Sequence, residues 1–97
     1  MSLAHADLRG TDAVRLLRTL CNHWRHKFEI RRDHDHHAHI PFASDIGADF
    51  TVAGDVLTIR IDAAPEQMAH IQQVITDHLR RFARDETLHF DWRESPR

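Results

Sequence analysis

The stretch TDAVRLLRTLCNHWRHK, residues 11–27, is the longest segment in which a helical period and reactive side chains coincide. At about 100° per residue, its apolar side chains fall on one face and most of its basic side chains fall opposite. The apolar face carries Ala13, Leu17, Leu20, Cys21, Trp24 and Phe28. Thr11 or Asp12 can cap the start, because either side-chain oxygen can accept from a free N–H of the first turn. The stretch therefore predicts an amphipathic helix that covers a core.

A second helix is predicted from about Pro65 to Ala83. Asp62 can cap its start, and Pro65 is tolerated in the first turn, where its missing N–H costs nothing. Its apolar stripe is Met68, Ile71, Ile75, Leu79 and Phe82. His78 falls inside that stripe, so this helix also combines a core-facing surface with a titratable side chain.

Alternation of apolar and polar residues predicts six strands around these helices. They are Leu3–Arg9, Phe28–Arg32, His37–Phe42, 48–52, 57–61 and Thr87–Trp92. Asp33–His36 is predicted to be a turn, and Ala53-Gly54-Asp55 supplies a tight turn between two strands.

These elements predict an α+β fold with two layers, in the order β-α-β-β-β-β-α-β. We expect a six-stranded, mainly antiparallel sheet with two helices on one face. Residues 1–97 are expected to form a single domain with a frayed tail at 94–97. The second face of the sheet, here called the open face, is expected to be polar. Its expected residues are His5, Arg9, Glu29, Arg31, His37, His39, Thr58, Arg60, His89 and Asp91.

Composition narrows the class of protein. The formal net charge of −2, from 13 basic and 15 acidic residues in 97, argues against a nucleic-acid partner. Cys21 is the single cysteine, so an internal disulfide is not possible and a cytoplasmic setting is favoured. No apolar run approaches the roughly 18 residues of a membrane helix, and the first residues lack a signal-peptide pattern, so we expect no membrane partner.

The 10 histidines are the most unusual feature of the composition. The first candidate group, here called the helix-end site, comprises His23, His26, Lys27, His78 and Arg81. His23, His26 and His78 can together provide three ligands for a transition metal such as zinc or iron, with one position left open. Alternatively, Lys27 and Arg81 can bind an anion or small acid. A third possibility is a purely structural role, in which the ring nitrogens bond to the backbone or to each other.

Two other surfaces are candidates for binding. His34, His36, His37 and His39 can hold a metal where the chain folds over, although a solvated turn would bind it only adventitiously. The open face lacks aromatic residues on which bases could stack, so contact with a second copy of the chain, or with another protein, is favoured over nucleic acid.

Catalysis has little support in the sequence. Ser2, Ser44 and Ser95 lie in expected loops or tails without a glycine-flanked elbow. Cys21 points toward the core, and no glycine-rich phosphate cradle is present. A non-enzymatic binding or accessory module is expected.

Three motifs carry a family resemblance. They are LCNHWRHK at 20–27, IPF at 40–42 and HLRRFARDETLHFDW at 78–92. With them the chain resembles the bacterial family catalogued as domain of unknown function 2218. The family pattern corresponds here to His23, His26, Lys27, His78, Arg81, Phe82 and Trp92. The resemblance implies a link to siderophore-interacting proteins and hence to iron uptake, whereas DHDHH at 33–37 departs from the family pattern.

Overall fold

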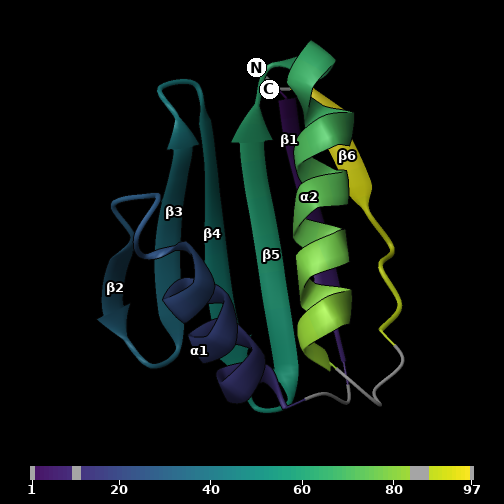
Figure 1. Cartoon of the computed structure of the whole chain (residues 1–97). Helices are drawn as coiled ribbons and strands as arrows, with labels where there is room; N and C mark the ends of the chain where they lie inside the picture. The colour runs from purple at the N-terminus through teal and green to yellow at the C-terminus, as the bar shows by residue number, and fades with distance from the viewer. Residues whose placement is uncertain (1, 10–11, 84–87, 97) are drawn as a thin grey trace.

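The computed structural model describes residues 2–9, 12–83 and 88–96, and it arranges them in two layers (Figure 1). The elements are β1 Ser2–Leu8, α1 Ala13–Trp24, β2 Arg31–His34, β3 His37–Ala43, β4 Ile46–Ala53, β5 Val56–Ala63, α2 Pro65–Ala83 and β6 Arg93–Pro96. The predicted fold class and element order are confirmed. Neither described helix is long and apolar enough to span a membrane.

The sheet has the strand order β2-β3-β4-β5-β1-β6, and every neighbouring pair is antiparallel. Strands β2 to β5 follow one another through short turns. At the Gly54-Asp55 turn, Gly54 has φ 61°, a left-handed conformation that glycine adopts without steric cost. β1 then lies between β5 and β6, so the first and last strands of the chain are neighbours.

Both helices cover the same face of the sheet, and the other face has no covering layer in the described chain (Figure 1). Alternate residues of the strands point toward the helices and are fully buried, among them Ile40, Phe50, Ile59 and Ile61. The helices contribute Leu16, Leu17, Leu20, Met68, Ile75 and Leu79. These side chains form one core, as the two apolar stripes predict.

α1 begins after Asp12, whose side chain accepts a hydrogen bond from the Arg15 backbone N–H at 3.3 Å. It ends at Trp24, where the backbone N–H groups of Lys27 and Phe28 both donate to the Trp24 carbonyl. Phe28 packs on Trp24 and on Phe42, with ring centroids 6.0 and 5.0 Å apart. The apolar side chain expected to start a strand therefore belongs to an aromatic cluster at the end of α1.

This packing corrects the prediction for the second strand. The predicted strand Phe28–Arg32 is wrong in its bounds, because β2 begins only at Arg31 and runs to His34. The predicted turn Asp33–His36 shortens to residues 35 and 36. Asp33 and His34 are drawn into β2 because that strand pairs with β3, with His34 opposite His37.

The C-terminal strand is also corrected. Of the predicted strand Thr87–Trp92, Thr87 lies outside the described residues, and Leu88 to Trp92 form no strand. Their side chains pack along α2: Arg80 lies over the Phe90 ring at 5.3 Å, and the Trp92 indole N–H donates to Thr76 Oγ1 at 3.1 Å. The strand is Arg93–Pro96, so it includes residues 94–96 of the segment expected to be a frayed tail. An alternating pattern predicts an extended chain but not which layer it contacts.

Candidate functional site

The structure brings together His23 and His78, two imidazoles from different helices. His23 lies in the last turn of α1 and His78 lies near the end of α2. Their ring centroids are 5.1 Å apart, with an interplanar angle of 52°. His23 is exposed and His78 is half-buried, so this pair can be reached from solvent.

Backbone and aromatic contacts fix the orientation of the His78 ring. Its Nδ1 lies 2.7 Å from the Val74 carbonyl oxygen, which can only accept, so Nδ1 carries the proton in the neutral ring. Nε2 then holds a lone pair that can accept a hydrogen bond or ligate a metal. The Trp24 and Phe82 rings lie 4.8 and 6.2 Å from the His78 ring, and Phe82 also lies 5.4 Å from His23.

The other residues of the predicted helix-end site make contacts outside this pair or are exposed. His26 is exposed, and its Nε2 accepts from Arg25 Nε at 3.4 Å. Lys27 Nζ lies 5.7 Å from the centre of the Phe28 ring. Arg81 is exposed and follows His78 by three residues, on the same face of α2.

The predicted set of three histidine ligands is not assembled. Within residues 2–9, 12–83 and 88–96, no three His, Cys, Asp or Glu side chains are grouped so that they could hold a metal ion. The two imidazoles His23 and His78 remain as candidate donors, and any further ligand would have to come from the bound molecule.

Arg15 is a residue that the sequence does not single out, because the helical period puts it on the polar face of α1, opposite the apolar one. Its guanidinium donates to the Phe82 carbonyl at 3.3 Å, at the C-terminal end of α2, where free carbonyls favour a cation. This bond links the start of α1 to the end of α2. The missed signal is the unpaired carbonyls of the last turn of α2, which need donors.

The histidine-rich hairpin of β2 and β3 divides into two parts. His34 and His36 are exposed at the turn, with ring centroids 5.9 Å apart. His37 and His39 lie on the open face and contact carboxylates there. His37 Nδ1 is 3.0 Å from Asp33 Oδ2, and His39 Nδ1 is 3.0 Å from Asp49 Oδ1. The turn at residues 44 and 45 alone would set His39 opposite Phe50. The register shift between Pro41 and Ala43 places Asp49 opposite His39 instead, so this partner could not be found from the turn.

Cys21 is 5% exposed, and burial raises the pKa of its thiol above the ordinary value of 9.0, while the Arg32 guanidinium acts in the opposite direction with a smaller effect. A buried thiol with a raised pKa is a poor nucleophile. Cys21 is therefore part of the core, as the sequence predicts.

The fold and the site define a small two-layer α+β protein with a solvent-accessible histidine pair near the ends of its helices. Comparison with known proteins identifies its family. Residues 5–93 match the model of the family described as uncharacterized protein conserved in bacteria (DUF2218), and the chain belongs to that family. This confirms the resemblance.

A solved structure supports the same fold. The chain is similar to the NMR structure of PA4090 from Pseudomonas aeruginosa, with 30% sequence identity, a TM-score of 0.77 and 96% of each chain covered. A comparison with curated proteins found no match.

Proposed function

We propose that this chain is a small binding module whose helix-end site takes a transition-metal ion carried by a small anionic chelator. The observation that supports this proposal is the approach of His23 and His78 to 5.1 Å, with the proton of neutral His78 held on Nδ1 by the Val74 carbonyl. Two imidazoles that approach from different helices can donate to one ion.

Two protein ligands leave several coordination positions for donors of the bound molecule. This division of ligands agrees with the absence of a three-ligand group among the described residues. Zinc and iron both accept imidazole nitrogen, and oxygen donors of a chelator can complete their coordination.

Basic side chains close to the pair in sequence would attract the negative charge of the chelator. Lys27 and Arg81 are both exposed. Lys27 lies in the turn after α1, four residues from His23, and Arg81 lies on α2, three residues from His78. A guanidinium can hold a carboxylate through two parallel hydrogen bonds, and an ammonium adds a point charge. The proposed ligand is therefore a small acidic metal chelate, and the context that we propose is cytoplasmic iron handling beside a siderophore-related protein.

Titration calorimetry with Zn²⁺, with citrate and with equimolar Zn²⁺ and citrate tests this proposal. We expect the chelate to bind more tightly than citrate alone, because only the chelate offers a metal to the imidazoles. His23→Ala and His78→Gln should each weaken chelate binding at least about tenfold, the loss expected for one metal ligand or its support.

His70→Ala is the matched control, since His70 is an exposed histidine of α2 outside the helix-end site. Imidazole NMR spectra recorded during the titration separate the helix-end site from His34 and His36. Binding that is unchanged in both His23→Ala and His78→Gln, or that shifts only the hairpin histidines, would rule out the proposed site.

A further inference from the structure

The open face carries a continuous row of side chains that crosses all six strands. The strand registers place these residues directly opposite one another on successive strands: Arg31, His39, Asp49, Arg60, His5 and Arg93. Three arginines and two histidines make this row predominantly basic.

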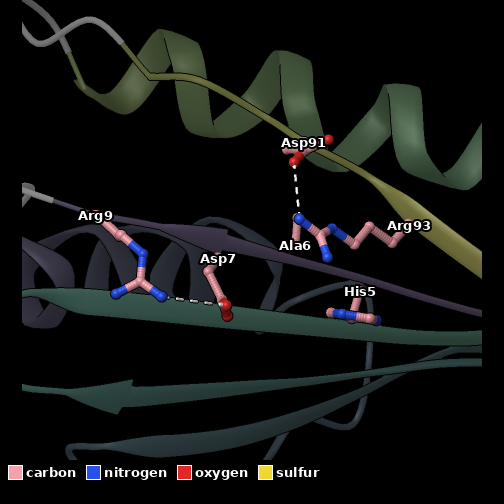
Figure 2. Close-up of a pocket in the computed structure, with 6 residues that line it drawn as sticks. All are labelled: His5, Ala6, Asp7, Arg9, Asp91 and Arg93. Atoms are coloured by element: carbon pink, nitrogen blue, oxygen red, sulfur yellow. Dashed lines mark hydrogen bonds and ion pairs between the residues drawn. The ribbon is translucent and has the colours of Figure 1, made fainter.

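The next row, two residues along each strand, has the opposite character. It includes Asp33 on β2, Asp7 on β1 and Asp91 just before β6, with His37, Thr51 and Thr58 between them. Arg31, His5 and Arg93 therefore each lie two residues from an aspartate on the same segment. Figure 2 shows part of this arrangement, where His5, Asp7, Arg9, Asp91 and Arg93 line a depression of about 290 Å³.

We infer that the open face packs against the open face of a second copy of this chain, related by a twofold axis that crosses the strands between the two rows. Such an axis places the basic row of one copy over the acidic row of the other, strand by strand. Arg31 then faces the second copy's Asp33, His5 faces its Asp7, and Arg93 faces its Asp91. The twofold axis forms each of these three contacts twice, once in each direction, so the interface is self-complementary.

Three properties of the described residues favour a second copy as the occupant. The side chains that would pair are exposed, with Arg93 and Asp91 at 72% and 81%. The central positions set His39 against His37, Asp49 against Thr51 and Arg60 against Thr58, so no like formal charges face each other there. The net charge of −2 is small, so overall repulsion between copies is weak.

The existing contacts of the open face hold the two rows in register. Thr58 Oγ1 donates to Asp7 Oδ1 at 2.7 Å, and Asp49 Oδ1 contacts His39 at 3.0 Å and His37 Nε2 at 3.4 Å. Side chains that are already positioned lose less freedom when a partner docks. Aligned packing of two such sheets would bring their faces about 10 Å apart.

Sedimentation velocity of the whole chain tests the inference. At about 50 mM NaCl and high protein concentration we expect a species of twice the 11.4 kDa chain mass, and about 500 mM NaCl should shift it toward monomer, because salt screens exposed charges. A monomer at every concentration and salt tested would overturn the inference.

Charge reversal tests the geometry. Arg93→Asp alone and Asp91→Arg alone each place like charges opposite one another, and each should weaken the dimer at least about tenfold. Mixing these two variants should restore a heterodimer, because each reversed charge then faces its opposite. Arg18→Asp, on the exposed face of α1, makes the same charge change as Arg93→Asp away from the sheet and should leave the dimer intact. Failure of the mixed variants to associate would exclude this twofold axis.

Discussion

Cys21 shows how one buried residue couples the stability of the fold to pH. Burial raises the pKa of its thiol in the folded chain, so the unfolded chain loses the thiol proton at lower pH than the folded chain does. The stabilisation linked to this thiol is complete below the ordinary pKa of 9.0 and is lost as pH rises through the folded-state pKa.

We therefore expect the free energy of unfolding, measured with urea, to fall between about pH 8 and pH 10, where an ordinary thiol titrates. The chain suits this experiment because it has no tyrosine and a single lysine, Lys27. Cys21→Ala should lower stability at both pH values but show a smaller decrease between them. An equal decrease in both proteins would contradict the assignment to Cys21.

Gly54 gives the turn between β4 and β5 a backbone conformation that most residues avoid. Its φ of 61° is left-handed, and a Cβ built there meets no atom within 4 Å, so strain rather than collision decides a substitution. Gly54→Ala should cost about 1 kcal/mol of unfolding free energy in thermal or urea unfolding. Gly54→Asn should cost less, because asparagine tolerates this conformation. Equal losses would indicate that the turn changes shape.

At the scale of elements, the segment from Leu88 to Trp92 stabilises α2 from outside the sheet. Thr76 is buried, and the Trp92 indole provides its hydrogen bond at 3.1 Å. Trp92→Phe retains an aromatic ring next to Phe90 but leaves the Thr76 hydroxyl without that donor. We expect a loss of about 1–2 kcal/mol in urea unfolding.

Thr76→Val, alone and combined with Trp92→Phe, tests whether Trp92 and Thr76 are energetically coupled. If the hydrogen bond carries the effect, the double variant should be less destabilised than the sum of the single variants. Simple additivity would show that Trp92 acts only through its ring packing.

Most elements could be predicted from the sequence because their apolar periods are long and regular. α2 has a stripe from Met68 to Phe82, and β4 and β5 alternate around a turn with glycine. The alternating period failed for the strand expected to start at Phe28, because Phe28 lies at the turn after α1 and packs on Trp24. It also failed for Leu88 to Trp92, because an extended segment can pack apolar side chains on a helix as well as in a sheet. The order of the strands in the sheet could not be predicted either. A periodic pattern does not say which strands pair, and β1 and β6 are far apart in the sequence but neighbours in the sheet.

The sequence could predict which residues belong to the candidate site better than it could predict their geometry. Positions on two helical faces place His23 and His78 beside apolar stripes, but the apolar period does not specify how two helices cross, and so does not predict that the two imidazoles meet. The hydrogen bond from His78 to Val74 depends on a side-chain rotamer, which a periodic pattern does not specify.

At the scale of the whole molecule, one core joins both helices to all of the central strands. A single core predicts a single cooperative unfolding transition. In Trp92→Phe the remaining Trp24 packs among Phe28, Phe42 and His78 at the end of α1. Its fluorescence should change with the same midpoint as far-UV circular dichroism. Two separate midpoints would show that α1 unfolds independently of the sheet.

Because β1 and β6 are paired, Ser2 lies directly opposite Pro96, and Figure 1 shows both ends of the chain at the same end of the sheet. Opposed residues in an antiparallel ladder have Cα atoms about 5 Å apart. A host protein could therefore carry this fold as an insertion in a surface loop, since entry and exit points so close together would hardly displace the host backbone.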